Sequence, residues 1–179
     1  MDVIKIINKF YNENSEVYRI LLNHGRSVAD KALSIARSHP EMNLDRIFLE
    51  EAALLHDIGI VFCRAPALDC HGTHDYICHG YLGAELLRQE GLLQHALVCE
   101  RHTGTGITQA MIEAKQLPLP RLDFVPVTLE EQVICFSDKF FSKTNVGKEK
   151  SISQIVDSLR KHGEENVLRF DHWCKRFLE

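Results

Sequence analysis

Several features that mark whole classes of protein are missing from this sequence. No apolar run in its 179 residues approaches the ~20 consecutive residues that a membrane-spanning helix needs. Six cysteines are present, but no two are spaced as Cys-x-x-Cys, and no secretory signal begins the chain. We therefore expect a cytoplasmic protein with reduced thiols, no disulfide scaffold and no membrane partner.

A strong excess of one charge is also missing. The formal net charge is -4, which disfavours a protein that binds a nucleic-acid polymer through bulk attraction to its phosphates. The same value allows a local basic pocket for a small phosphorylated ligand. Apolar residues make up 45% and charged residues 26% of the chain, so the composition is that of a globular domain with a substantial core.

Strand patterns are almost absent, whereas apolar residues recur with the 3.6-residue period of helices. We predict an all-α fold, a single domain over residues 1–179 with eight to ten helices, and find no strong signal for a sheet. Apolar stripes and helix start and stop signals place helical segments at 17–22, 28–36, 44–57, 75–90, 92–102, 108–116, 128–143, 151–162 and 164–177. Gly59 is expected to end the third of these or to let the chain turn there.

Capping signals mark the starts of three segments. Glu131 stands three residues after Thr128, and Gln154 three residues after Ser151, which is the spacing of a capping box. Asp75 suits an N-cap, with a role as general acid as the alternative.

The irregular segment 60–74 contains two histidines, His71 and His74. We expect them in a solvent-facing loop. Substrate contact and a further metal are the alternatives.

An imidazole and a carboxylate, His56 and Asp57, stand side by side at the end of an apolar segment. The residues Ala52-Ala53-Leu54-Leu55 precede them and Ile58-Gly59-Ile60 follows, so this turn should be buried. Burying an unpaired carboxylate is costly, and Asp57 therefore needs a partner. A metal ion would serve, and hydrogen bonds to local backbone are the alternative.

Four more ionisable side chains stand beside apolar helical segments: His24, His79, His102 and Asp138. A single histidine near an apolar face is more often a satisfied core residue than a ligand, but a set on separate helices is harder to explain in that way. Imidazole nitrogen and carboxylate oxygen together suit iron, manganese, zinc or nickel. Because helix bundles place such sites on facing interior side chains, the sequence predicts an interior metal site.

The ordered set of these six residues resembles the HD-domain superfamily of metal-dependent phosphohydrolases. The His-Asp-Ile-Gly stretch at 56–59 is similar to that of the HDIG-type members, and Glu100-Arg101-His102-Thr103-Gly104 and Ser137-Asp138-Lys139 extend the resemblance. It is strongest over 20–145, and closest to small stand-alone members. It implies a helical bundle with an interior metal site, on which the C-terminal helices of 151–178 pack.

The resemblance also implies a role for each ligand. One divalent ion would be held by His24, His56, Asp57 and Asp138, and a second by His79 and His102, with Asp57 bridging the two. Such a pair of ions can generate hydroxide at neutral pH and clamp a phosphoryl group. The resemblance favours iron, with manganese, nickel or zinc as alternatives.

Three basic residues near the ligands are candidates for binding a substrate phosphate. Lys139 follows Asp138, Arg26 lies just beyond His24, and Arg101 precedes His102. An exposed surface position is the alternative for each. We expect Lys139 to act in catalysis together with Asp57.

We thus expect a metal-dependent hydrolase that acts on a phosphoric ester or anhydride in a nucleotide or other small phosphorylated metabolite. Two alternatives remain at this point. One is a mixed-valent di-iron oxygenase of the same family, which would use the same six ligands, and the other is a non-catalytic ligand sensor. A homo-oligomer is compatible with all three.

Overall fold

The computed structural model describes residues 1–145 and 147–179, and α-helices dominate both ranges. The helices are α1 (Val3–Ile7), α2 (Glu16–Ser38), α3 (Arg46–Leu55), α4 (His79–Gln89), α5 (Leu93–Arg101), α6 (Gln109–Lys115), α7 (Leu129–Asp138), α8 (Ile152–Arg160) and α9 (Glu164–Phe177). Short 3-10 turns are η1 (Pro40–Met42), η2 (Ile58–Phe62), η3 (Pro66–Leu68) and η4 (Tyr76–Cys78). The strands β1 (Arg64–Ala65) and β2 (Cys70–His71) form a small antiparallel hairpin. The predicted all-α fold is confirmed.

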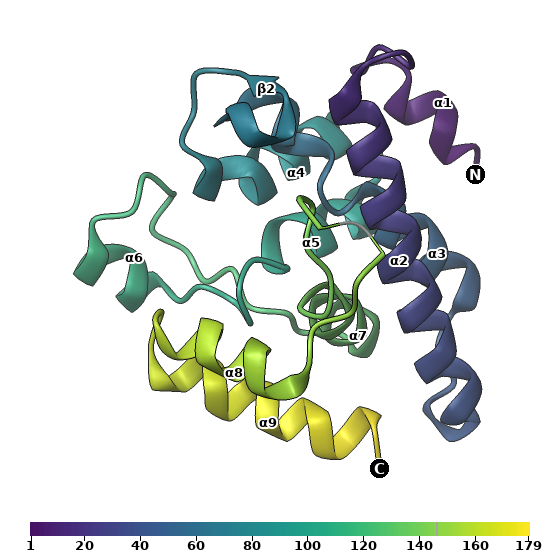
Figure 1. Cartoon of the computed structure of the whole chain (residues 1–179), viewed down its shortest axis with the longest axis vertical. Coiled ribbons are helices and arrows are strands. Elements are labelled where there is room, and N and C mark those ends of the chain that lie inside the picture. The colour runs from purple at the N-terminus through teal and green to yellow at the C-terminus, as the bar shows by residue number, and fades with distance from the viewer. Residues whose placement is uncertain (146) are drawn as a thin grey trace.

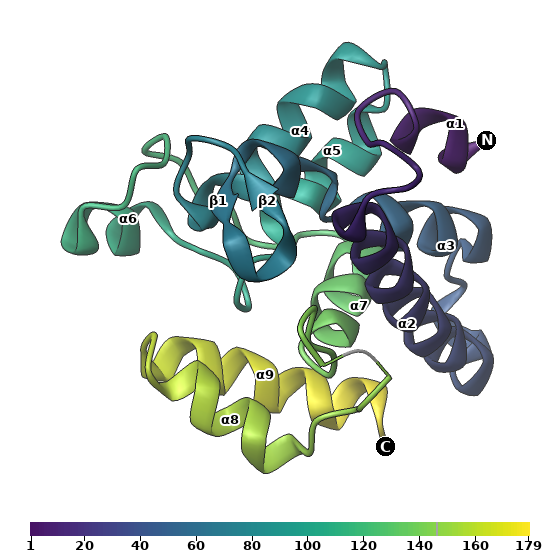
Figure 2. The ribbon, with the colours of Figure 1, turned by 45° about the horizontal axis from the view of Figure 1, so that its top comes forward.

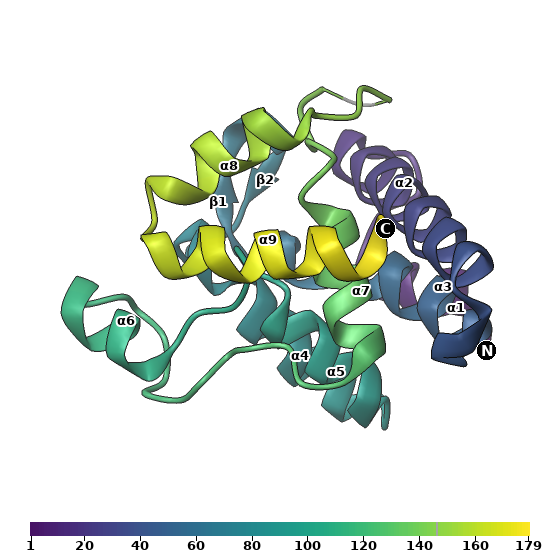
Figure 3. The same cartoon turned by 90° about the horizontal axis from the view of Figure 1, so that it is seen from below.

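The helices pack in pairs around α7. α2 packs along α3, and α4 along α5, while α8 and α9 lie side by side beneath α7 (Figures 1 and 2). Seen from below, α9 runs across the end of α7, and α6 stands apart at one edge (Figure 3). One long helix, α2, contains both of the apolar segments that were predicted separately at 17–22 and 28–36.

The two larger hydrophobic clusters of the described residues both include side chains of α2 and α5. One joins α2, α3 and the buried face of α7 to α8 and α9, whose aromatic residues Phe170, Trp173 and Phe177 are almost fully buried. The other joins α1, α2, η2, α4 and α5. The C-terminal helices therefore share a core with the helices that carry the predicted ligands.

Helix termini follow the capping signals in part. Ser151 and Gln154 form the complete reciprocal capping box that the sequence predicts. Thr128 accepts from Glu131 N, but the Glu131 carboxylate accepts from Val127 N, so this box is only half made. Asp75 occupies the N-cap position of η4, but its exposed side chain makes no capping hydrogen bond.

Two helices end earlier than predicted. α3 ends at Leu55, and His56 and Asp57 then lead into η2 instead of continuing the helix. α7 ends at Asp138, five residues before the predicted end at 143. The chain beyond it turns back, and Lys150 N donates to Phe140 O. Both early ends are followed by a turn with polar side chains that are buried or largely buried, His56 and Asp57 after α3 and Lys143 after α7.

Gly59 serves close packing and does not end a helix by a left-handed turn. A Cβ atom at this position would lie 2.1 Å from His79 O and 2.4 Å from Gly83 N, which are backbone atoms of α4. The bare Cα of Gly59 therefore allows η2 to touch α4. This contact holds the turn that follows His56 and Asp57 against the start of α4, where His79 lies.

Replacing Gly59 with alanine should lower the free energy of unfolding by about 3 kcal/mol, the upper end of ordinary overpacking, because backbone must move to admit the methyl group. Urea denaturation measures this directly. The matched control is Ser34→Ala at an exposed position of α2, which should change the value by less than about 0.5 kcal/mol. Equal stability of Gly59→Ala and the wild type would contradict the packing of η2 on α4.

Candidate metal centre

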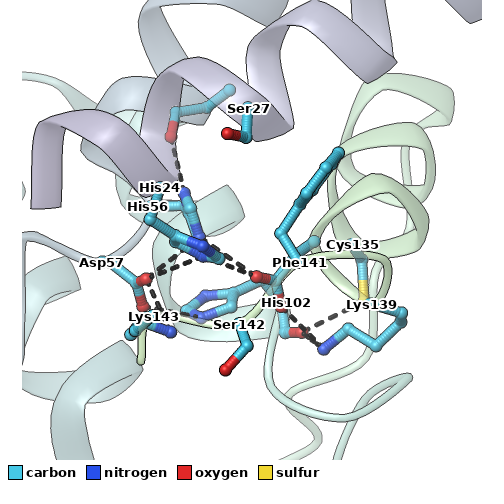
Figure 4. Close-up of polar contacts among 12 residues, drawn as sticks. His24, Ser27, His56, Asp57, His102, Cys135, Lys139, Phe141, Ser142 and Lys143 are labelled. Atoms are coloured by element: carbon cyan, nitrogen blue, oxygen red, sulfur yellow. Dashed lines mark hydrogen bonds and ion pairs between the residues drawn. The ribbon is translucent and has the colours of Figure 1, made fainter. Parts of the chain in front are cut away.

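The six predicted ligands come from five separate elements and meet in the interior. His24 lies mid-way along α2, His56 and Asp57 follow the end of α3, His79 begins α4, His102 follows α5, and Asp138 ends α7. All six are buried. Figure 4 shows His24, His56, His102 and Asp57 pointing toward one another. Four of the five elements carry their ligands at or just beyond a helix end, where the backbone leaves the regular hydrogen-bonding pattern of the helix.

Three histidine rings are oriented by the backbone that precedes them. The Nδ1 atoms of His56, His79 and His102 lie 2.6–2.7 Å from the carbonyl oxygens of Ala53, Tyr76 and Cys99, each three residues earlier. A carbonyl can only accept, so each Nδ1 carries the hydrogen and donates it. The Nε2 lone pair of each ring is then free to bind a cation, which is the usual arrangement for a metal-bound histidine.

The Asp57 carboxylate divides the histidines into two pairs. Its Oδ2 lies 3.3 Å from His24 Nε2 and 3.2 Å from His56 Nε2. Its Oδ1 lies 3.3 Å from the Nε2 atoms of both His79 and His102. One carboxylate oxygen thus faces each pair, as a bridging ligand between two ions would.

Asp138 completes the first pair. Its Oδ1 lies 2.8 Å from His24 Nε2 and 3.5 Å from His56 Nε2. The ligand atoms of His24, His56 and Asp138 lie within 4.8 Å of one another, and so do those of His56, Asp57 and His102. Distances of this order allow several of these atoms to bind one ion after small movements.

Polar atoms in this cluster lack ordinary partners. Among the residues that the structure describes, no donor reaches Asp57 Oδ1 or His56 Nε2 in hydrogen-bond geometry, whereas Asp57 Oδ2 has the ammonium group of Lys143 2.8 Å away. His79 Nε2 and His102 Nε2 face each other at 3.0 Å, although both rings already carry their hydrogen on Nδ1. Two lone pairs at this distance repel unless a cation lies between or beside them. The donor set therefore fits a divalent metal.

Burial and charge act against each other in the cluster. Burial lowers the pKa of His102 to about 3, so its ring is neutral at pH 7. Burial also disfavours the charged ring of His56, but the carboxylates of Asp57 and Asp138 raise its pKa to about 9, so a metal ion would displace a proton from its Nε2. Burial would raise the pKa of Asp57, yet Lys143 and His56 hold it well below its usual range. Both carboxylates of the cluster are thus held in the ionised form, in which they can bind a cation.

The HD domain family matches residues 21–142, which include all six candidate ligands. The chain belongs to the HD domain family. This outcome confirms the resemblance seen in the sequence. The HD domain and its clusters of histidine and aspartate fit the binding of divalent metal, whose identity and number they leave open.

Relatives differ in how much of their length this HD domain spans. The chain is 31% identical over 166 residues to the uncharacterized protein MJ0778 of Methanocaldococcus jannaschii, and the matched segment covers 91% of this chain and 85% of the relative. It is 34% identical over 148 residues to a tRNA (cytidine(56)-2'-O)-methyltransferase of Thermoplasma volcanium, covering 82% of this chain but 38% of that protein. The HD domain thus matches only a part of the methyltransferase.

A solved structure shares the fold. The HD domain of the L. monocytogenes phosphodiesterase PgpH superposes with a TM-score of 0.56 at 16% identity, over 93% of this chain and 85% of that one. Within the part of the chain that the structure describes, no helix has the length and apolar character needed to cross a membrane.

Two lysines flank the ligands of this HD domain. Lys139 Nζ lies 2.8 Å from Asp138 Oδ2 and donates to His102 O at 3.2 Å. Lys143 Nζ lies 2.8 Å from Asp57 Oδ2 and is largely buried (Figure 4). Lys143 was missed in the sequence, because a helix continued to 143 turns its side chain about 140° away from Asp138. Because α7 ends at Asp138, the turn that follows it places the Lys143 side chain beside Asp57 instead.

The structure does not bring the two predicted arginines to the site. Arg26 lies two residues after His24, about 200° around α2, and its exposed side chain lines a separate hollow with Glu13 and Glu16. Arg101 forms an ion pair with Glu131, 3.1 Å away, on the side of α5 that faces α7. Their predicted contact with a substrate phosphate therefore finds no support in the geometry.

The histidines of the hairpin also stay outside the HD-domain centre. His71 and His74 are exposed, and His71 Nε2 lies 3.0 Å from Asp69 Oδ1. Asp75 is likewise exposed and lies 4.0 Å from an Arg64 nitrogen. The segment therefore has the solvent-facing character expected from the sequence, and Asp75 is not placed to act as a general acid.

A cavity of about 480 Å³ adjoins the ligand cluster. Asp138, Lys139 and Lys143 line it on the side of the cluster. Tyr76 and the β1–β2 hairpin form one wall, and residues of α8 form another. A small molecule in this cavity would lie against the candidate metal ligands.

Proposed function

We propose that this HD domain is a metal-dependent phosphohydrolase that acts on a nucleotide or another small phosphorylated metabolite through two divalent ions. The observation that carries the proposal is the division of the Asp57 oxygens between two histidine pairs. One pair is completed by Asp138, so each ion would have its own nitrogen ligands and one shared carboxylate. Iron is the proposed metal, with manganese, nickel or zinc as alternatives.

The residues of the chain supply position and charge for the reaction. When bound, a pair of divalent ions lowers the pKa of a water ligand and neutralises phosphoryl oxygens. The backbone-oriented rings of His56, His79 and His102 keep their Nε2 atoms aimed at the Asp57 carboxylate, His56 at Oδ2 and the other two at Oδ1. Lys139 and Lys143 add two ammonium groups at the edge of the cavity. Together they favour an anionic group held next to Asp57 and Asp138.

The size of the cavity supports a small substrate. About 480 Å³ is within the range of small-molecule sites. The chain's net charge of -4 gives no general attraction to a nucleic-acid polymer. We therefore propose a soluble phosphorylated metabolite as the substrate.

Phosphate release from a panel of nucleotides, dinucleotides and other phosphate esters tests the proposal. The protein is stripped with a chelator and reloaded with iron, manganese, nickel or zinc, and each form is assayed with and without oxygen. The proposal expects metal-dependent phosphate release that does not depend on oxygen. Substrate turnover only with iron and oxygen would instead identify an oxygenase, and metal-free ligand binding without turnover would identify a sensor.

Lys139→Ala should reduce kcat/KM for the best substrate roughly ten- to a hundredfold, the loss expected for one charge-assisted hydrogen bond of about 1.5–3 kcal/mol. Metal content should be unchanged, because Lys139 contacts Asp138 Oδ2 and leaves Oδ1 to the histidines. Contact in both ground and transition states would raise KM, while contact made only during transfer would lower kcat. Lys148→Ala, an exposed lysine of the same segment, is the control. Unchanged kinetics would remove Lys139 from the site.

A further inference from the structure

A third lysine, Lys150, faces the same cavity and has a different set of contacts from the other two. Its Nζ donates to the carbonyl oxygens of Phe141 at 3.2 Å and Lys139 at 3.4 Å. Within residues 1–145 and 147–179, no carboxylate lies within ion-pair distance of it. Lys139 and Lys143, in contrast, each lie 2.8 Å from a carboxylate oxygen. Lys150 is therefore the ammonium group of the cavity whose charge is not offset by a neighbouring carboxylate.

The charges around the cavity do not balance without an anion. Asp138 is the one carboxylate among the described residues that line it, and Asp57 lies just behind, against Lys143. Three ammonium charges and the two charges of even one divalent ion, set against these two carboxylates, leave three positive charges in excess. A singly charged phosphodiester would offset only one of them. A terminal phosphate, with two negative charges, offsets more.

The surroundings of Lys150 make its charge effective. The residue is half-buried, so its field is screened less than that of a surface lysine. Burial lowers the pKa of Lys150, Asp138 opposes this effect, and the ammonium groups of Lys139 and Lys143 lower the pKa further. Lys139, Lys143 and Lys150 line the same cavity, so their three ammonium groups surround the space that an anion would occupy.

Apolar side chains from three segments line part of the cavity wall. Leu68 comes from the hairpin segment, Phe141 from the turn after α7, and Ile155 and Leu159 from α8. Three of these side chains offer aliphatic surface, and Phe141 offers an aromatic ring. A ligand with its phosphate among the lysines would therefore place an organic group against this wall.

We infer that the cavity selects compact organic molecules with a terminal, doubly charged phosphate over phosphodiesters, and that Lys150 makes the distinction. This inference rests on the proposed function and narrows it. In this arrangement Lys139 and Lys143 lie beside the metal ligands, and Lys150 offsets the second negative charge of the phosphate. The organic group contacts the apolar wall.

Binding of two non-hydrolysable probes tests the inference without any need for turnover. Phenylphosphonate and its methyl monoester share an aromatic ring and differ by one negative charge at pH 8. Calorimetric titration of the metal-loaded protein should show phenylphosphonate bound roughly tenfold or more tightly, the effect of one charge-assisted contact. Equal affinity for the two probes would overturn the inference.

Variants at position 150 separate charge selection from a structural role. In Lys150→Met the preference should fall to about threefold or less, while Lys150→Arg should retain it, because only the arginine keeps the charge. Lys148→Met is the matched control and should bind as the wild type does. If Lys150→Met weakened both probes equally, Lys150 would only hold the carbonyls of the turn, and its assignment would be wrong. Equal melting temperatures of the variants ensure that folded protein is compared.

The two proposals can fail separately. If the probes are discriminated but no phosphate ester is hydrolysed with any metal, the phosphohydrolase proposal fails and the anion selectivity stands. If esters are hydrolysed but both probes bind alike, the selectivity fails and the hydrolase stands.

Discussion

Asp57→Ala should lose bound metal more completely than any other single ligand substitution. Its two oxygens face different histidine pairs, so one change removes a ligand from both proposed ions. Its negative charge also offsets the charge of the ions, and no other carboxylate lies so close to all four rings in the described structure. Activity should fall by more than the roughly 10–100-fold that loss of an outer-shell metal partner costs. Elemental analysis of the purified, metal-loaded variants gives metal per chain.

The control must separate loss of metal from loss of folding. Without Asp57, the buried ammonium of Lys143 loses its partner, which is itself destabilising. Asp57→Asn combined with Lys143→Met removes both charges and keeps the side chains similar in size. This double variant should recover stability and still bind little metal. A folded Asp57→Ala protein that keeps two ions would contradict the bridging role.

His79→Ala and His102→Ala should each lower metal content toward one ion per chain. Both Nε2 atoms face Asp57 Oδ1, while Oδ2 faces the other pair, so the remaining ion keeps its nitrogen and carboxylate ligands. Activity should fall far more than stability in each case, because a two-ion reaction cannot proceed with one. Metal per chain, phosphate release and thermal melting are measured on the same preparations.

His71→Ala is the matched control for these two changes, because His71 is an exposed histidine outside the cluster. It should keep two ions and full turnover. If His79→Ala and His102→Ala also kept both, the assignment of a second ion to these rings would be wrong.

The candidate ligands could be predicted from the sequence because histidine and aspartate are residue types that bind metal, and here they occur beside apolar segments. A buried carboxylate next to a histidine needs a partner, and the same need recurs at His24, His79, His102 and Asp138. These residues stand on apolar helical segments that must face a common interior. Their convergence therefore followed from the fold class together with the family pattern.

The residues around the ligands depended on features that the sequence does not display. Arg26 was expected at the site from its nearness to His24 in the chain, but two residues along a helix point to opposite sides. Lys143 and Lys150 were missed because their positions depend on where α7 ends. Beyond that end the chain turns back, and Lys150 N donates to Phe140 O. Helix ends are the least predictable part of a helix, and here they shape the cavity.

The anomalous scattering of zinc in crystals of the zinc-loaded protein tests the central claim most directly. The account predicts two zinc peaks inside the helical bundle. One should lie about 2.0–2.2 Å from ligand atoms of His24, His56 and Asp138, the other at the same distance from His79 and His102, with Asp57 bound to both. No peak within the cluster, or zinc bound only at surface residues, would contradict a metal centre at this site.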